Sequence, residues 1–168
     1  VFNDSERDTA NILNNCVLNY GGRDQPGGIN RKDYGTIRFF NAIAQVDSCR
    51  IEQTHTSALG IYGSASPKIT HCDLHNIRFT PITMSMFASP VFSENVVSNL
   101  GINAIGIAQE TYALDATIPK RNFGGYNNIT YFIYRTCTVN SGTVITIPEG
   151  VVFKTDYTDF FDVEGALM

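Results

Sequence analysis

An internal repeat with a period of about 23 residues is the feature that most constrains how this chain can fold. Segment 46–51 aligns with 69–74, and 69–74 aligns with 92–97 after the same offset. Two columns of apolar residues keep this register later in each copy: Leu59, Ile82 and Ile105 in the first, and Ile61, Met84 and Ile107 in the second. A fixed period of about 20 to 50 residues is typical of solenoids, in which each copy stacks on its neighbours.

The repeat continues in a weaker form on both sides of these copies. Upstream, 13–18 matches 46–51 if an insertion is allowed between them, and the segment 20–28 supplies it with the Gly-rich composition of a loop. Downstream, 138–143 resembles 162–167 at nearly the same offset. We expect the following organisation: β rungs over 1–110 with an insertion at 20–34, a loop or connection at 111–128, and further β rungs at 129–168 whose last copy is truncated at the C-terminus.

The apolar residues of each copy alternate over short runs that end at Asn, Ser, Gly or Pro, which indicates β-strands. No segment keeps the spacing of about 3.6 residues that an amphipathic helix requires. Short strands in copies of this length fit a coil whose turns stack about 4.8 Å apart. The Leu-x-x-Leu-x-Leu pattern of leucine-rich repeats is absent. The sequence therefore predicts an all-β fold, a parallel β-helix (solenoid) with rungs of about 23 residues.

Two parts of the chain resemble β-helices of known groups. The pattern in 69–90, Ile-Thr-x-Cys-x-Leu followed by a polar corner, Ile-x-Met and Ser-Pro, resembles the right-handed parallel β-helix of the pectin-lyase-like superfamily over about 10–110. Segment 137–154 resembles the rungs that open β-helical regions of large bacterial surface proteins, and this likeness extends over 129–168. The resemblance implies a right-handed coil in a secreted or surface-displayed bacterial protein, and so an extracellular or cell-surface location. It specifies architecture more strongly than activity.

Charge and hydropathy narrow the classes of partner. The 12 Lys and Arg against 16 Asp and Glu give a formal net charge of −4, which offers no general electrostatic footprint for nucleic acid. No run approaches the roughly 20 apolar residues that span a bilayer, so no membrane span is expected. The start at Val1 has neither an initiator Met nor the apolar core of a signal peptide, which indicates a processed or excised piece of a longer chain.

Three of the four cysteines occupy one column of the repeat. Cys16, Cys49 and Cys72 align, and Asn95 takes the same place in the next copy. Adjacent residues in register lie about 4.8 Å apart, farther than the roughly 3.8 Å between Cβ atoms in a disulfide. There is also no Cys-x-x-Cys spacing. We therefore predict that these cysteines pack inward as small hydrophobic residues, and we expect no metal and no cofactor.

A His-x-Asp-x-His row at His71, Asp73 and His75 has the residue types of a divalent-metal site. With Cys72 and Leu74 facing inward, all three side chains are expected to face solvent from one strand. The repeat predicts three pairs across this face: Arg50 with Asp73, Glu52 with His75, and His71 with Glu94. A solvated charge ladder is therefore the preferred interpretation, and a carbohydrate-contact face and a metal site are the alternatives.

Tyrosines and charged residues of the two insertions are the candidates for ligand contact, because loop residues are less committed to the core than strand residues. The candidates are Tyr20, Arg23, Tyr112, Lys120, Arg121 and Tyr126. The first insertion follows the strand near Leu18 and the second follows Ile107, at a later corner of the turn, so we expect them to protrude from different edges. Plain spacer loops are the competing interpretation.

Missing catalytic patterns favour a non-catalytic role. Lyases and hydrolases with this fold use carboxylates that hold Ca²⁺ or flank a bond, whereas this chain lacks Asn-Thr-Asp, Asp-Asp, Gly-His-Gly and Arg-Ile-Lys motifs. We expect a structural, adhesive or glycan-binding segment whose partner is a polysaccharide or cell-surface glycan. The alternative is a polysaccharide lyase or glycoside hydrolase that acts on acidic or plant-type polysaccharide. The unfinished last rung also predicts a cap or an edge-mediated dimer at the C-terminal end.

Overall fold

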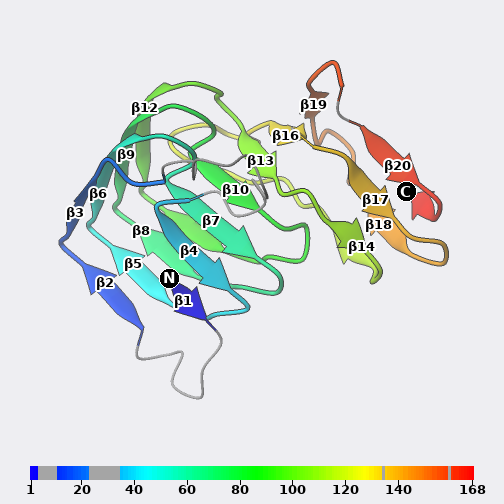
Figure 1. Ribbon diagram of the computed structural model, residues 1–168, viewed down its shortest axis with the longest axis horizontal. Coiled ribbons are helices and arrows are strands. Elements are labelled where there is room, and N and C mark those ends of the chain that lie inside the picture. The colour runs from blue at the N-terminus through cyan, green and yellow to red at the C-terminus, as the bar shows by residue number, and fades with distance from the viewer. Residues whose placement is uncertain (4–10, 23–34, 134, 159) are drawn as a thin grey trace, which may run out of the picture.

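A computed structural model describes residues 1–3, 11–22, 35–133, 135–158 and 160–168 and shows a parallel β-solenoid (Figure 1). The described strands form five parallel sheets, here called sheets A to E. Each turn passes through sheet A and then through either sheets B and C or sheets D and E. The described ranges contain no helix with the length and apolar character that a membrane crossing requires. The five parallel sheets confirm the predicted all-β solenoid.

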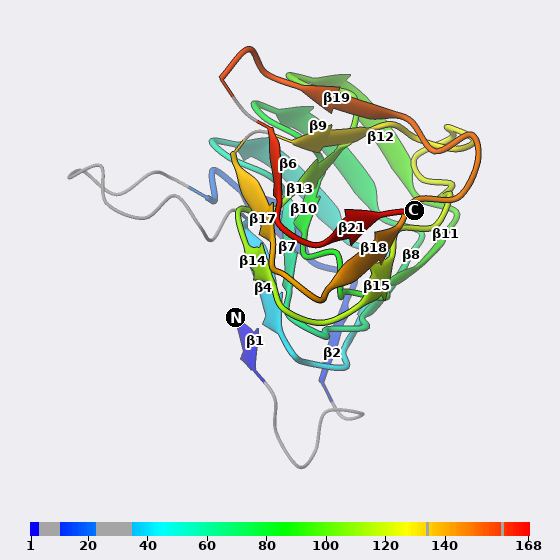
Figure 2. The same ribbon diagram turned by 90° about the vertical axis from the view of Figure 1, so that its right-hand side faces the viewer.

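Sheet A runs the length of the solenoid, and the other sheets each cover part of it (Figure 1). Figure 2 looks along the stack of turns. Sheet A contains β1 (Phe2–Asn3), β4 (Ile37–Phe40), β7 (Leu59–Tyr62), β10 (Ile82–Met84), β13 (Ile105–Ile107), β16 (Tyr131–Ile133) and β19 (Phe153–Thr155). Sheet B contains β2 (Ile12–Asn14), β5 (Gln45–Asp47), β8 (Lys68–Thr70) and β11 (Val91–Ser93), and sheet C contains β3 (Val17–Asn19), β6 (Arg50–Thr54), β9 (Asp73–Ile77) and β12 (Val96–Leu100). Sheet D contains β14 (Thr111–Tyr112), β17 (Cys137–Val139) and β20 (Phe161–Val163), and sheet E contains β15 (Ala116–Thr117), β18 (Val144–Thr146) and β21 (Ala166–Leu167).

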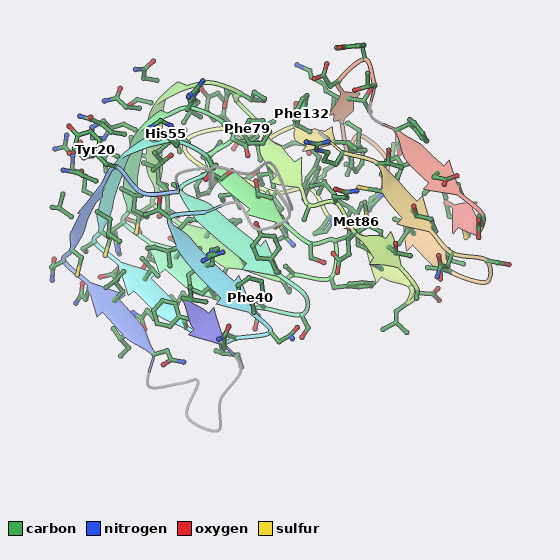
Figure 3. The ribbon with its side chains drawn as sticks, in the orientation of Figure 1. Tyr20, Phe40, His55, Phe79, Met86 and Phe132 are labelled. Atoms are coloured by element: carbon green, nitrogen blue, oxygen red, sulfur yellow. The ribbon has the colours of Figure 1, made fainter. Side chains whose placement is uncertain are left out.

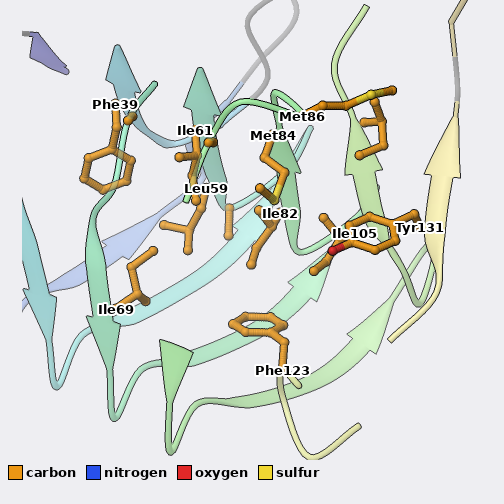
Figure 4. Packing of buried hydrophobic residues seen from close by; sticks show 14 of the residues in the cluster. Phe39, Leu59, Ile61, Ile69, Ile82, Met84, Met86, Ile105, Phe123 and Tyr131 are labelled. Carbon is orange, nitrogen blue, oxygen red and sulfur yellow. The ribbon is translucent and has the colours of Figure 1, made fainter. Parts of the chain in front are cut away.

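The predicted apolar columns are aligned in register along sheet A. Strand β10 pairs with β7 on one side and with β13 on the other, so that Ile82 lies between Leu59 and Ile105. All three side chains are fully buried, and Figure 4 shows them in the interior of the coil. Side chains alternate between the two faces of a strand, which is why every second residue of these copies enters the core.

The first copy also has the predicted register. Leu13 pairs with Val46 between β2 and β5, and Leu18 pairs with Ile51 between β3 and β6. The separation in sequence is longer here than between the later copies, because the insertion lies between the first copy and the next. The weak upstream repeat is therefore a genuine turn of the solenoid.

The segment 111–128 differs from the predicted loop, since it contains β14 and β15. Thr111 of β14 pairs with Thr138 of β17, and Ala116 of β15 pairs with Ile145 of β18. Tyr112, in β14, is 0% exposed, and its ring centroid lies 5.3 Å from that of Phe87. The loop position predicted for Tyr112 is therefore wrong, because the strand pairing turns this ring into the core.

Residues 118–128 cross the ends of sheets B and C. The ring centroid of Phe123 lies 4.8 Å from that of Phe92 in β11, the last strand of sheet B. The guanidinium of Arg121 donates hydrogen bonds at 3.1 and 3.2 Å to two backbone carbonyl oxygens in the turn before β11. This segment covers the last turn of sheet B, and strand pairing to the later turns continues through sheet A.

The cysteine column packs inward as predicted and ends at Asn95. Cys49 and Cys72 are buried, Cys16 is partly buried, and all four cysteines of the chain are thiols. Burial raises the pKa of the Cys72 thiol to about 11, so the thiol keeps its proton and donates to a backbone carbonyl at 3.2 Å. In the next turn, Asn95 Oδ1 accepts a hydrogen bond from Cys72 N at 3.0 Å, and Asn95 Nδ2 donates one to Ile69 O at 2.9 Å.

The C-terminal turn exposes apolar side chains at the end of the coil. Among the described residues, no strand pairs with the outer edge of β19, β20 or β21. Tyr157 is 95% exposed, and Phe160, Leu167 and Met168 are also exposed. The edge-mediated dimer expected at this end stays a prediction.

Candidate functional site

The predicted charge ladder is formed along sheets B and C. The charge ladder consists of the residues Asp47, Arg50, Glu52, His71, Asp73, His75 and Glu94. Arg50 Nε lies 3.9 Å from Asp73 Oδ2, and the Glu52 carboxylate contacts His75 Nε2. His71 Nε2 lies 3.4 Å from Glu94 Oε2. The three predicted pairs are therefore present, and the parallel register of β6 and β9 sets Arg50 opposite Asp73 and Glu52 opposite His75.

His71 differs from its predicted place on the strand. Asp73 and His75 belong to β9, whereas His71 lies in the bend between β8 and β9 with a φ of 52°. Its Nδ1 lies 2.8 Å from Asp47 Oδ1. The hydrogen bond from His71, followed by one from Thr70, lowers the pKa of Asp47 to about 2. The same bond to Asp47 raises the pKa of His71.

His75 is shielded, contrary to the expectation that the whole row faces solvent. Its side chain is 14% exposed, whereas those of His71 and Asp73 are about half exposed. Arg50 Nη2 lies 2.9 Å from His75 Nε2, and Glu52 contacts the same nitrogen, so both side chains cover the ring. The described residues hold no group of three His, Cys, Asp or Glu arranged to bind a metal ion. The row forms part of an ion-pair network.

Replacing Asp47 by asparagine is expected to lower the pKa of His71, because the Asp47 hydrogen bond is the main cause that raises it. NMR titration of the His71 ring measures this shift. The raised His71 pKa contributes stability below its ordinary value of 6.5, lost as pH rises through the folded pKa. The lowered Asp47 pKa contributes stability above its ordinary value of 3.8, lost as pH falls toward about 2. The difference in unfolding free energy between wild type and variant should therefore be greatest between about pH 4 and 6.5.

Glu94→Gln is the matched control for this titration. It removes a carboxylate from the other ring nitrogen of His71, at 3.4 Å instead of 2.8 Å. The His71 pKa should therefore move less than in Asp47→Asn. A larger shift in the control would contradict the assignment of Asp47 as the main partner.

A column of residues with left-handed backbone lies along sheet C. Tyr20, Gln53, Asn76 and Asn99 succeed one another turn by turn, and their φ angles lie between 50° and 59°. Asn99 Nδ2 donates a hydrogen bond to Asn76 Oδ1 at 2.5 Å. Asparagine tolerates this backbone region better than most residues. The repeat places all four side chains at the same exposed position of each turn.

An open pocket of about 370 Å³ lies beside this column. It is lined by Tyr20, Gln53, Thr54, His55, Asn76 and Arg78. Tyr20 is 68% exposed, and Figure 3 shows it close to His55 near the ends of β3 and β6. The pocket thus combines an aromatic ring, two amides, an imidazole and a guanidinium.

Of the predicted ligand-contact residues that the structure describes, Tyr20 alone lines this pocket. Arg23 lies outside the described residues. Tyr112 is a core residue, and its hydroxyl donates to the carbonyl oxygen of Ala108 at 3.4 Å. A ligand that contacts the solvent-exposed surface does not reach this ring.

The other three candidates lie in the segment over the ends of sheets B and C. Lys120 and Tyr126 are exposed there, so a role in ligand contact stays a prediction for both. Arg121 is half-buried, and its guanidinium nitrogens donate to two backbone carbonyls, which is a structural role. These residues do not line the pocket at Tyr20.

Among the described residues that line the pocket, sequence reasoning missed Thr54 and four exposed polar residues: Gln53, His55, Asn76 and Arg78. A signal for them was present, because Arg78 follows His55, and Asn76 follows Gln53, at the offset of the repeat. The repeat therefore places each of these pairs at one position of successive turns.

Comparison of the chain with protein-family models, curated proteins and solved structures found no match.

Proposed function

We propose that this chain is a non-catalytic β-helical segment of an extracellular or cell-surface protein and that it binds a glycan at the pocket beside Tyr20. The composition of that pocket carries the proposal. An exposed aromatic ring offers an apolar face on which a sugar ring stacks, and amide and guanidinium groups donate hydrogen bonds to sugar oxygens. The resemblance of 137–154 to rungs of bacterial surface proteins supports the location.

The solenoid supplies a rigid support for such a pocket. Gln53 and Asn76 come from β6 and β9, which pair on both sides of these two residues, and Tyr20 follows the neighbouring strand β3. Groups held on paired strands lose little conformational freedom when a ligand binds. A coil of stacked turns is also suited to act as a stalk that presents this surface.

The state of the carboxylates on the same surface supports a binding role over hydrolysis. Glu52 lies 2.9 Å from Arg50 and contacts His75, and Asp47 accepts hydrogen bonds from His71 and from a threonine. A glycosidase needs one carboxyl group as acid and a second as base or nucleophile beside the bond that breaks. The ladder carboxylates are instead held by neighbouring side chains.

A glycan array followed by titration of the best ligand tests the proposal. Tyr20→Ala should weaken binding about tenfold, because it removes the stacking face. Tyr157→Ala is the matched control, since Tyr157 is another exposed tyrosine that neither lines the pocket nor is a predicted ligand contact. An array without signal above background would refute the proposal, and equal losses in both variants would refute this location of the site.

The enzymatic alternative has a separate test. A panel of acidic and plant-type polysaccharides, assayed for unsaturated products and for new reducing ends, should show no turnover. Reproducible turnover that disappears on replacement of Asp73 or Lys120 would overturn the non-catalytic assignment.

A further inference from the structure

Two nitrogen-rich side chains meet in the pocket beside Tyr20. Arg78 Nη1 lies 3.5 Å from His55 Nδ1. An arginine side chain only donates hydrogen bonds, so His55 Nδ1 is the acceptor and the ring carries its hydrogen at Nε2. Both residues are exposed. The remaining guanidinium N–H groups and the His55 Nε2–H are thus donors for a ligand in the pocket.

Among the described residues, the pocket holds none of the carboxylates that neutralise a cation elsewhere on the same sheet. Arg50 lies 2.9 Å from Glu52 and 3.9 Å from Asp73. By contrast, within the described ranges neither Asp nor Glu lines the pocket, and no ion pair joins Arg78 to a carboxylate. Because the chain as a whole has a net charge of −4, this cationic spot is a local feature.

We infer that the pocket binds the anionic group of an acidic glycan, a carboxylate or a sulfate ester. The inference rests on the proposed glycan binding and adds the chemical class of the sugar. The planar guanidinium of Arg78 donates two parallel hydrogen bonds to such oxygens, and charge-assisted bonds are about twice as strong as neutral ones. The Gln53 amide and the Nδ2 group of Asn76, whose Oδ1 already accepts from Asn99, are left for neutral sugar oxygens, and the Tyr20 ring for the sugar face.

Calorimetric titration of the full chain with two matched pairs of oligosaccharides tests this inference. One pair is a glucuronate-containing oligosaccharide and its methyl ester, and the other is a sulfated dextran oligosaccharide and its unsulfated form. In at least one pair the anionic member should bind about tenfold more tightly than the neutral member. The pair that shows the difference identifies the group as carboxylate or sulfate.

Two variants with the same change in charge distinguish anion binding in the pocket from general electrostatic attraction of the anionic probe to the protein surface. Arg78→Gln should weaken binding of the anionic probe about tenfold. Lys68→Gln removes one positive charge from an exposed residue of β8 outside the pocket, so it should change affinity less than about twofold. Circular dichroism and thermal melting establish that both variants are folded.

The outcomes separate this inference from the proposed function. Equal binding of anionic and neutral members, or equal weakening by the two substitutions, overturns the anion site and leaves glycan binding intact. Failure of all four probes also overturns the anion site, and the glycan array then decides the proposed function independently.

Discussion

Replacing Ile82 by alanine is expected to destabilise the protein by about 2–5 kcal/mol. Ile82 is 0% exposed and pairs in register with Leu59 and Ile105 in the middle of sheet A. Truncation removes the apolar contacts of Ile82 with the turn before it and with the turn after it, and it leaves a cavity between them. In a solenoid, stability depends on the interfaces between neighbouring turns, so one such cavity weakens two of them.

Urea unfolding followed by circular dichroism measures the change in free energy. Val91→Ala is the matched control, because Val91 is a branched aliphatic residue in β11 of the same turn but is 57% exposed. Its loss should be below about 1 kcal/mol. A cost for Ile82→Ala no greater than that of the control would contradict the central place of this column in the core.

The stacking of the turns could be predicted in detail from β5 to β13, because the period is constant there. A constant period leaves one register for parallel strands, so the sequence alone predicts the Leu59, Ile82 and Ile105 column and the Arg50–Asp73 and Glu52–His75 pairs. Cross-strand neighbours in a parallel sheet follow from this offset. The same offset locates Asn95 in the cysteine column.

The period fails between β13 and β17, and the loop predicted at 111–128 is wrong there, whereas farther along the chain Val139 pairs with Val163 as the downstream repeat predicts. Strand β14 pairs with β17, and β15 with β18, at longer offsets than those of the earlier copies, so no column of the repeat marks these strands. Tyr112 is therefore predicted to be a loop residue, although it pairs with Val139 in a strand and its side chain is buried in the core.

Backbone bends account for the contacts of the candidate site that were not predicted. The left-handed φ of His71 takes its ring off the strand, which makes Asp47 its nearest partner at 2.8 Å. A similar bend at Gln53 and Asn76 precedes His55 and Arg78 at the pocket. Polar residues of different types occupy these positions, so the repeat shows their spacing without showing the conformation that they share.

Replacing Asn95 by alanine is expected to destabilise the protein by about 2–6 kcal/mol, since two buried backbone groups lose their partners at about 1–3 kcal/mol each. Asn95 accepts from Cys72 N at 3.0 Å and donates to Ile69 O at 2.9 Å, and β11 and β12 on either side of it are the last strands of their sheets. The amide therefore closes the cysteine column where, among the described residues, no further strand of sheet B or C follows.

Asn95→Cys and Asn103→Ala sharpen this test. A thiol in this column donates to a carbonyl oxygen of the preceding turn, as Cys72 Sγ does to Val46 O at 3.7 Å, but it offers a poor acceptor for Cys72 N. Asn95→Cys should therefore cost less than Asn95→Ala and more than the exposed Asn103→Ala, which should stay within about 0.5 kcal/mol. Equal urea midpoints for wild type and Asn95→Ala would show that the column does not need its amide terminus.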